Sequence, residues 1–398
     1  MRLSRRLPPH GQTNAITRAH AALAAAGTPI ADLTASNPTE AGLAYPPALL
    51  APLGSAEALT YAPEARGLRA AREAVAADAA RRGAAVDPDR VVLSASSSES
   101  YSWLFKAFCD PHDPVLVPRP SYPLFEHLAG LESVRMEPYA LGYHGRWEVD
   151  LAAVERGLAT GARLVVAVSP NNPTGSCLSA READALIALT ARAGVPLVVD
   201  EVFADYLLEP GPDAVTDLAT RAAGHRGAAV ITLGGLSKSV GLPQVKLGWM
   251  ILGGDDAVLE PALAGLELIA DSYLSVSTPV QMAAPALLRE GVAVRRQIQE
   301  RIRANTAALS RAVAGHPACD LLPVEGGWSA VVRVPATRPE EQLVLDLLTR
   351  EHVLVHPGYF FDFPREAYLV VSLLPPPAVF SDAVERMLGL ANTPPSPA

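Results

Sequence analysis

Short apolar runs alternate with alanine-rich helical patterns from about residue 65 to 250. This alternation is typical of βαβ units, so we expect a mostly parallel sheet with helices on both faces. Nearly every run leads into a cluster rich in Gly, Pro or Ser. Ligands of such sheets bind at the carboxyl ends of the strands, so these clusters should face one crevice. The runs cover residues 91–93, 115–117, 164–168, 196–199, 230–233 and 247–252.

The remaining segments predict a second, smaller domain. Residues 14–26 are expected to form a helix and residues 286–312 a long charged helix. Strand-like and helical segments follow at residues 329–334, 341–350, 353–355 and 368–373. The predicted fold class is therefore α/β: a three-layer, mostly parallel large domain with a smaller α+β domain. Its expected boundaries are 1–45 (N-terminal helix and active-site loop, part of the small domain), 46–285 (large domain), 286–390 (small domain) and 391–398 (disordered tail).

Composition and missing motifs exclude several classes of function. A net charge of −9 over 398 residues argues against a nucleic-acid partner. No apolar run approaches the roughly 18 residues of a membrane span, and three unpatterned cysteines together with the absence of a signal peptide predict a cytoplasmic protein. The chain lacks GxGxxG, GxxxxGK[ST] and HExxH, and Cys109 with His112 is a lone pair, so no metal site is expected.

Three clusters carry reactive side chains. Ser94 to Ser100 precede an apolar helical stretch, where hydroxyls and free helix N–H groups can hold a phosphate. Asp200 directly follows a buried run, where a carboxylate needs a cation or hydrogen bonds. Lys238 is one of only three lysines. An amine near the apolar mouth of a sheet has a lowered pKa and can form a Schiff base with an aldehyde.

Each cluster alone also has a structural explanation. The serines can simply cap a helix, Asp200 can pair with an arginine, and Lys238 can be a surface lysine. The Asn171-Asn172-Pro173 segment can be a tight turn. Taken together, however, the clusters complement one another. A carboxylate for a pyridine nitrogen, an amine for an imine and a phosphate site are what pyridoxal phosphate chemistry needs.

Six motifs in this order resemble the class I/II aminotransferases, the aspartate aminotransferase-like enzymes of pyridoxal phosphate fold type I. The resemblance extends from about residue 30 to 390. The motifs are Tyr61-Ala62-Pro63 with Gly67-Leu68-Arg69, Ser94 to Ser98, Pro120-Ser121-Tyr122-Pro123, Asn171-Asn172-Pro173-Thr174-Gly175, Asp200-Glu201-Val202-Phe203, and Ser237-Lys238 with Lys246-Leu247-Gly248.

The resemblance implies a role for each matching residue. Lys238 would form the Schiff base and move the substrate proton, Asp200 would keep the pyridine nitrogen protonated, and Tyr122 would stack on the ring. Other implied cofactor contacts are Asn172 with the ring hydroxyl, Phe203 beside it, Ser237 next to the lysine, the phosphate ligands Ser96, Ser97, Ser98 and Lys246, and Tyr61 from the neighbouring subunit. The implied substrate pocket contains Asn37, Thr39, Trp328 and Tyr359. A homodimer with sites near the subunit interface is also implied.

The chain departs from the family pattern at four positions. Phe203 replaces a tyrosine that bonds the ring hydroxyl, Gly235 replaces a phosphate-binding serine, and Lys246 replaces an arginine. Val370 stands where the family has the arginine that binds the substrate's α-carboxylate. Two interpretations remain open. Either another arginine binds the carboxylate, with Arg119, Arg333 and Arg365 as candidates, or the substrate has no carboxylate there.

The sequence therefore predicts a pyridoxal phosphate-dependent aminotransferase that moves an amino group between a small-molecule amino donor and an oxo acceptor. The loss of the usual arginine at Val370 makes an atypical substrate an open possibility. The alternative on the same fold is a lyase, acting by β-elimination or C–S cleavage, or a decarboxylase. A pyridoxal phosphate-binding regulatory domain without turnover is a remote alternative, because the chain has no room for a DNA-binding module before the domain.

Overall fold

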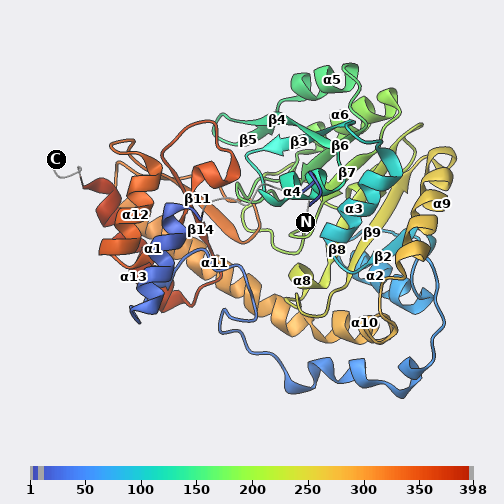
Figure 1. Cartoon of the computed structure of the whole chain (residues 1–398), viewed down its shortest axis with the longest axis horizontal. Helices are drawn as coiled ribbons and strands as arrows, with labels where there is room; N and C mark the ends of the chain where they lie inside the picture. The colour runs from blue at the N-terminus through green and yellow to red at the C-terminus, as the bar shows by residue number, and fades with distance from the viewer. Residues whose placement is uncertain (1–2, 8–12, 394–398) are drawn as a thin grey trace.

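An eight-stranded sheet forms the centre of the larger part of the molecule (Figure 1). In this computed structural model, which describes residues 3–7 and 13–393, the strand order is β2-β9-β8-β7-β6-β3-β4-β5. The pairs β4–β3, β3–β6, β6–β7 and β7–β8 are parallel, whereas β9 is antiparallel to both of its neighbours. The strands are β2 (Val91–Ser94), β3 (Pro114–Arg119), β4 (Arg135–Tyr143), β5 (Trp147–Val149), β6 (Leu164–Val168), β7 (Leu197–Asp200), β8 (Ala229–Gly235) and β9 (Gly248–Gly254).

Helices cover both faces of this sheet and complete three layers. Because side chains alternate along a strand, Val115 and Val117 pack under one helical layer and Leu116 under the other. The first layer contains α3 (Ser97–Phe108), α4 (Leu124–Leu131) and α9 (Asp256–Tyr273). The second contains α5 (Leu151–Ala159), α6 (Ala180–Ala193) and α7 (Leu218–Arg221). The predicted three-layer α/β fold is confirmed.

Local signals explain where these helices begin and end. Helix α6 starts with a reciprocal capping box between Ser179 and Glu182. It ends at Gly194, which adopts the left-handed conformation with φ of 66°. Helices α2 (Arg69–Arg81), α8 (Leu236–Ser239), α10 (Thr278–Glu290) and α11 (Val292–Ala314) complete this part of the molecule.

A four-stranded antiparallel sheet forms the centre of the smaller part. Its order is β10 (Asp320–Leu321), β11 (Ser329–Arg333), β14 (Tyr368–Ser372) and β13 (His356–Pro357). Helices α12 (Glu340–Arg350) and α13 (Pro377–Asn392) belong to the same part, and α11 reaches it from the large sheet (Figure 1). The N-terminal segment joins it, because β1 (Ala31–Asp32) pairs with β12 (Val353–Leu354) and α1 (Ala15–Ala25) contacts α12.

Three details differ from the sequence expectations. Strands β4 and β5 were not predicted, because β4 lies near the sheet edge and mixes exposed, half-buried and buried residues rather than forming a continuous apolar run. The helix expected at 286–312 is two helices that meet at Gly291, where a Cβ atom would come within 2.6 Å of Val240. Helix α13 extends through Asn392, beyond the expected start of the tail at residue 391; residues 394–398 of that tail lie outside the described residues.

Three other properties follow from the described residues. None of their helices is long and apolar enough to cross a membrane. Within the same ranges, no group of three or more metal-binding side chains comes together. Cys109, Cys177 and Cys319 are all free thiols, as the spacing of the cysteines indicated.

Candidate active site

A cavity of about 410 Å³ lies where the large sheet faces β11, β13 and β14. The carboxyl ends of β6, β7 and β8 open into it, as the polar clusters after these strands indicated. Most of the side chains proposed from the sequence line this one cavity. They are Ser96, Ser97, Ser98, Tyr122, Asn172, Asp200, Phe203, Ser237, Lys238, Lys246 and Trp328.

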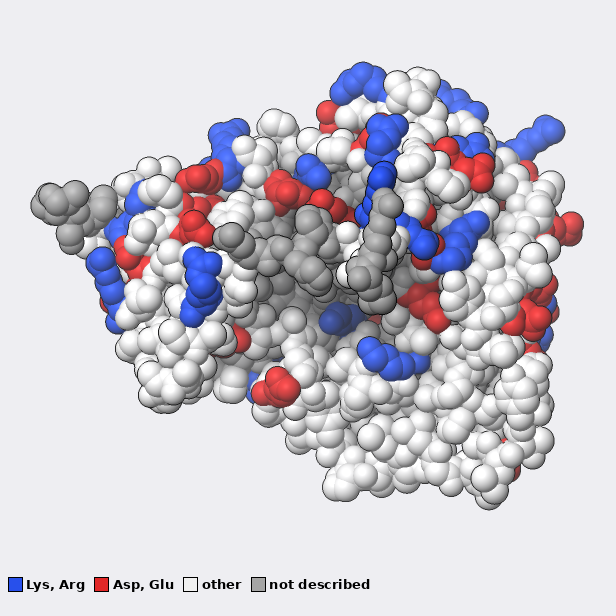
Figure 2. Space-filling model, in the orientation of Figure 1, with Lys and Arg blue, Asp and Glu red and all other residues white. Residues whose placement is uncertain are grey.

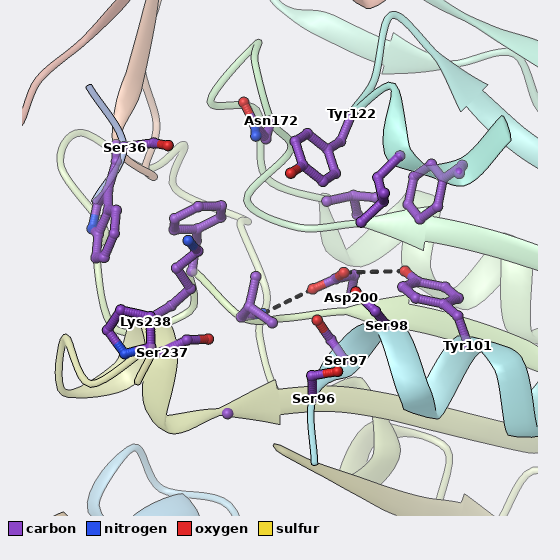
Figure 3. A pocket seen from close by; sticks show the side chains of 18 of the residues that line it. Ser36, Ser96, Ser97, Ser98, Tyr101, Tyr122, Asn172, Asp200, Ser237 and Lys238 are labelled. Carbon is purple, nitrogen blue, oxygen red and sulfur yellow. Dashed lines mark hydrogen bonds between the residues drawn. The ribbon is translucent and has the colours of Figure 1, made fainter. Parts of the chain in front are cut away.

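Asp200 is a buried carboxylate at the end of β7, and each of its oxygens accepts one hydrogen bond. The Val202 N–H donates to Oδ1 at 3.2 Å, and the Tyr101 hydroxyl donates to Oδ2 at 3.1 Å (Figure 3). Burial raises the pKa of Asp200 to about 6, although the two hydrogen bonds and the charge of Lys238 oppose that rise. The structure therefore presents Asp200 to the cavity as a fixed acceptor for a cationic partner.

Lys238 enters the same cavity from α8, which directly follows the neighbouring strand β8. Its amine nitrogen lies 5.1 Å from the ring centre of Trp328 and 5.8 Å from that of Phe203. Burial lowers the pKa of Lys238, against the opposing charge of Asp200. A lowered pKa increases the share of neutral amine, which is the nucleophilic form.

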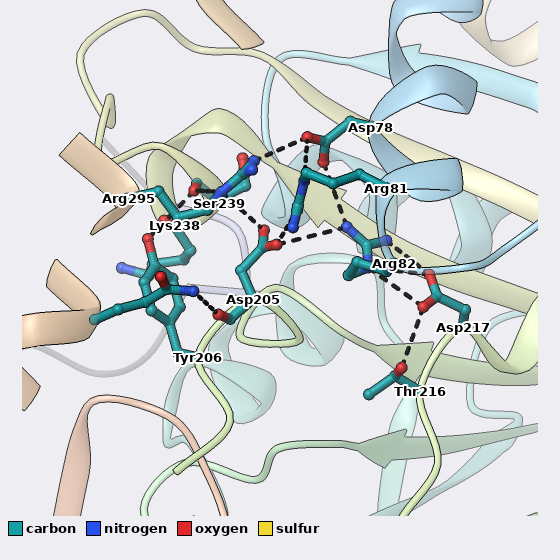
Figure 4. Close-up of polar contacts among 11 residues, drawn as sticks. Asp78, Arg81, Arg82, Asp205, Tyr206, Thr216, Asp217, Lys238, Ser239 and Arg295 are labelled. Carbon is teal, nitrogen blue, oxygen red and sulfur yellow. Dashed lines mark hydrogen bonds and ion pairs between the residues drawn. The ribbon is translucent and has the colours of Figure 1, made fainter. Parts of the chain in front are cut away.

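A buried network of ion pairs fixes the backbone around Lys238 (Figure 4). The Tyr206 hydroxyl donates to the carbonyl of Lys238 at 2.6 Å, and Arg295 Nε donates to the carbonyl of Ser239 at 2.7 Å. Arg295 also pairs with Asp78 at 2.9 Å, and both side chains are almost fully buried. The turn that carries the lysine is thus held from behind by charged groups that do not line the cavity.

The first turn of α3 presents serine side chains to the cavity. Ser96 caps this helix by accepting a hydrogen bond from the Glu99 N–H at 3.1 Å, so the capping explanation is correct for that residue. Ser97 and Ser98 occupy the first helical positions and line the cavity. Lys246, which has an unusual φ of 62°, adds a cation to the lining of the same cavity. This combination suits a phosphate group.

The adjacent residues Asn171 and Asn172 have different surroundings. Asn171 is buried and donates to the Pro120 carbonyl at 3.2 Å and to Thr174 Oγ1 at 2.8 Å, so it stabilises the turn. Asn172 instead lines the cavity and lies near Tyr122 in Figure 3, with Asp200 and Lys238 below them in that view.

Four proposed residues do not line the cavity. Asn37 accepts hydrogen bonds from the N–H and hydroxyl of Thr39 at 3.1 and 2.8 Å, so both residues are occupied in a local turn. Tyr359 is 41% exposed and packs against Phe360. Tyr61, which the resemblance placed in the neighbouring subunit's site, is 67% exposed in this chain.

The wall formed by the smaller part of the molecule contains no arginine among the described residues. Val370 and Ser372 face the cavity from β14, and His356 faces it from β13. Burial lowers the pKa of His356. The arginines considered as replacements are elsewhere: Arg119 pairs with Asp362 at 3.2 Å and Arg333 with Asp320 at 2.6 Å. Arg365 is exposed and does not line the cavity.

Sequence reasoning missed several cavity residues. Tyr101 was read as part of an apolar helical stretch, although its position three residues after Ser98 places both on one helix face. Thr34 and Ser36 lie in the loop that was expected to cross the site, but Asn37 and Thr39 were chosen instead. His356 lies in the two-residue strand β13 and belongs to no motif, so the sequence held no signal for it.

The residues that line the cavity fit pyridoxal phosphate. Asp200 offers a carboxylate for a protonated ring nitrogen, and the α3 N-terminus with Lys246 offers a site for a phosphate. Lys238 offers an amine with a lowered pKa in the same cavity. Phe203 has no hydroxyl to offer the ring, and its own ring packs edge-on against Trp328 at 5.3 Å.

Comparison with known proteins agrees with this chemistry. The family described as aminotransferase class I and II matches residues 30–384. An alanine aminotransferase of Mycobacterium tuberculosis is 27% identical, over 92% of this chain and 87% of its own length. The glutamate-pyruvate aminotransferase AlaA of Escherichia coli is 24% identical, over 78% of each chain.

Solved structures support the same fold. An alanine aminotransferase from Pyrococcus furiosus superposes with a TM-score of 0.84 at 21% identity, covering 94% of this chain and 95% of that one. A double mutant of Thermus thermophilus aspartate aminotransferase gives a TM-score of 0.82 at 23% identity, covering 98% and 100%. Because the family match spans most of the chain, the protein belongs to the class I and II aminotransferases and is a pyridoxal phosphate-dependent aminotransferase of fold type I.

Proposed function

We propose that this enzyme uses Lys238 to attach the cofactor and to move the substrate proton as an amino group passes from a small-molecule donor to an oxo acceptor. The observation that carries the proposal is the meeting of Lys238 and Asp200 in one cavity, from adjacent strands, with the pKa of each shifted by burial. Pyridoxal phosphate supplies, when bound, an aldehyde for amine attachment and a ring that withdraws electrons.

The other cavity residues hold the cofactor in this proposal. Asp200 accepts the hydrogen bond of the ring nitrogen and keeps it protonated. Ser96, Ser97, Ser98, Ser237 and Lys246 surround the phosphate, Asn172 bonds the ring hydroxyl, and Tyr122 covers the ring face. The absence of a hydroxyl at Phe203 leaves Asn172 as the one proposed partner of the ring hydroxyl among the described residues.

We further propose that substrate binding depends less on an α-carboxylate than it does in enzymes with the usual arginine. An unpaired carboxylate inside a cavity is costly. On the substrate side the described wall offers Val370, the Ser329 hydroxyl and His356, whose lowered pKa favours the neutral ring. The Ser372 hydroxyl already donates to the carbonyl of Ala35. Amino compounds without a carboxylate next to the reacting carbon therefore suit this wall better than α-amino acids do.

A homodimer is part of the same proposal. Glu57 is the only charged residue between residues 41 and 63, and the lower part of the face in Figure 2 carries few charged side chains. Leu59 is 90% exposed, and nearby Tyr61 and Leu274 are also exposed. Such a contiguous apolar surface favours contact with a second copy of the chain. We also keep the cytoplasm as the proposed location, which the three free thiols support.

The test mixes the cofactor-loaded enzyme with paired compounds, such as phenylalanine and phenylethylamine, without an oxo acceptor. Stoichiometric conversion to the pyridoxamine form, reversed by an oxo compound, is the expected result. The amine should react at least as well as the amino acid. Continuous release of ammonia, sulfide or carbon dioxide would establish the lyase or decarboxylase alternative. No spectral change with any compound would support the non-catalytic alternative.

A further inference from the structure

Tyr101 contacts the cofactor-binding carboxylate but matches none of the motifs that assign the site. Its side chain is 3% exposed and lines the cavity. Its hydroxyl lies 3.1 Å from Asp200 Oδ2, as Figure 3 shows. In the proposed function Asp200 must be ionised, because only a carboxylate pairs with a protonated ring nitrogen. Burial works against that ionisation, and a donor at Oδ2 works for it.

The surroundings of Tyr101 make it a fixed donor. Its ring packs edge-on against Phe125 at 5.1 Å with an interplanar angle of 76°, and it also contacts Phe105. Burial raises the pKa of the Tyr101 phenol well above its ordinary value, so the hydroxyl keeps its proton. A neutral phenol beside a carboxylate can only donate, so the direction of this hydrogen bond is set.

The two hydrogen bonds to Asp200 come from residues on either side of it in the sequence. Val202 lies just after Asp200 on the loop that follows β7, whereas Tyr101 lies on α3. One bond on each oxygen fixes the plane of the carboxylate. Ser97 and Ser98 are on the same short helix as Tyr101, within one turn of it.

We propose that Tyr101 is a positioning residue that orients the Asp200 carboxylate and keeps it ionised for the ring nitrogen of pyridoxal phosphate. Helix α3 thereby sets both ends of the bound cofactor: its first turn holds the phosphate, and its second holds the carboxylate that meets the ring. The inference rests on the proposed cofactor role of Asp200. No bond is made or broken by Tyr101.

The experiment measures pyridoxal phosphate affinity of the full-length apoenzyme from pH 5 to 9, for the wild type and Tyr101→Phe. In the wild type the affinity should rise with pH through a midpoint near the Asp200 pKa of about 6. Lys238 and Tyr122 also interact electrostatically with Asp200, but both are unchanged in Tyr101→Phe, so the difference between the two proteins reports on Asp200. Loss of a hydrogen bond to the charged form should move that midpoint up by about one pH unit, so the variant binds about tenfold more weakly at pH 5.

Tyr139→Phe is the matched control. Tyr139 is equally buried, but its hydroxyl donates to the Val166 carbonyl at 2.8 Å and does not line the cavity. Its variant should keep the wild-type midpoint. Thermal unfolding of all variants identifies any that fail to fold. A second measurement compares the cofactor affinity of Asp200→Asn with that of the double variant that also carries Tyr101→Phe. In that background Tyr101→Phe should change the affinity by less than about twofold, because no carboxylate is left to ionise.

An analogue with carbon in place of the ring nitrogen separates positioning from packing. Tyr101→Phe should bind this analogue about as tightly as the wild type does. Equal weakening for both cofactors, or an unchanged midpoint with pyridoxal phosphate, would overturn the inference while leaving the proposed function intact. Failure of the wild-type protein to bind pyridoxal phosphate at all would overturn the proposed function instead.

Discussion

The two sides of the cavity follow the family pattern to different degrees. On the side of the large sheet, Asp200, Lys238 and the α3 serines lie together, and charged or polar groups support the first two from behind. On the side of β13 and β14, the described residues that line the cavity are neutral or apolar, and they include Val370, the position where the family resemblance predicts an arginine. The difference teaches that cofactor chemistry and substrate recognition can change independently on one scaffold.

The largest effect is expected from a substitution of Lys238, on the large-sheet side of the cavity. Lys238→Ala should lower turnover by about 10⁴-fold or more, because it removes the buried amine with a lowered pKa, and the other lysine of the cavity, Lys246, is proposed to hold the phosphate. Steady-state kinetics with any responding amine measures it. Lys106→Ala is the control, since Lys106 pairs with Glu132 on the surface and should be silent. Normal turnover of Lys238→Ala would show that Lys238 does not carry the proposed chemistry, and the large-sheet side of the cavity would then not be the catalytic side.

The support behind Lys238 is expected to contribute strongly to stability. Arg295→Met should lower the free energy of unfolding by about 1.5–3 kcal/mol, because Asp78 loses its shortest and most buried ion pair while Arg81 and Arg82 remain at 3.3 Å. Chemical denaturation measures the loss, with the exposed Arg289→Met as control.

This loss should also depend on pH. Burial alone would raise the pKa of Asp78, but the charges of Arg295 and Arg81 outweigh burial and hold the pKa below its ordinary value. A carboxyl with a depressed folded pKa stabilises the fold above its unfolded pKa and loses that contribution as the pH falls. The gap between the wild type and Arg295→Met should therefore be widest above about pH 5 and narrow below about pH 4. A gap that stays constant on acidification would contradict the assigned pairing.

A substitution on the β14 side of the cavity tests whether that wall recognises a substrate carboxylate. Val370→Arg places a guanidinium where the cavity wall has none, so kcat/KM for an α-amino acid relative to its matching amine should rise by about 10- to 100-fold. Val370→Met controls for added volume without charge. If the ratio stays the same in Val370→Arg, the carboxylate of an amino acid does not reach this wall.

The smallest effect concerns the missing hydroxyl on the cofactor side. Phe203→Tyr restores a donor beside the proposed ring hydroxyl and should move the pH midpoint of the cofactor's visible absorption down by up to about one unit. The movement is checked by a spectral titration of the loaded enzyme, with Phe363→Tyr as a control at a buried residue that does not line the cavity. An unmoved midpoint would show that residue 203 does not face the ring.

The sequence predicted the fold because its buried strands are continuous apolar runs that end in polar clusters. Residues attached to such strand ends, such as Asp200 and Asn172, were placed on the cavity for the same reason. Prediction failed where position depends on distant packing. Tyr101 lies in an apolar stretch of the sequence, and only the folded structure brings its hydroxyl within hydrogen-bond distance of Asp200. Asn37 and Thr39 do not line the cavity, because their side chains hydrogen-bond to each other in a local turn.

Helix α11 joins the two sides of the cavity. Near its start, Arg295 holds the Ser239 carbonyl beside the lysine; ten residues later, Asn305 donates to the carbonyl of Leu373, just beyond β14. A helix rises about 15 Å over that interval and resists compression. The distance between the lysine side of the cavity and the β14 side is thus set by one rigid helix. Changes in accepted substrate size should therefore come from side chains on β13 and β14, whereas shortening or bending α11 would disturb the lysine as well.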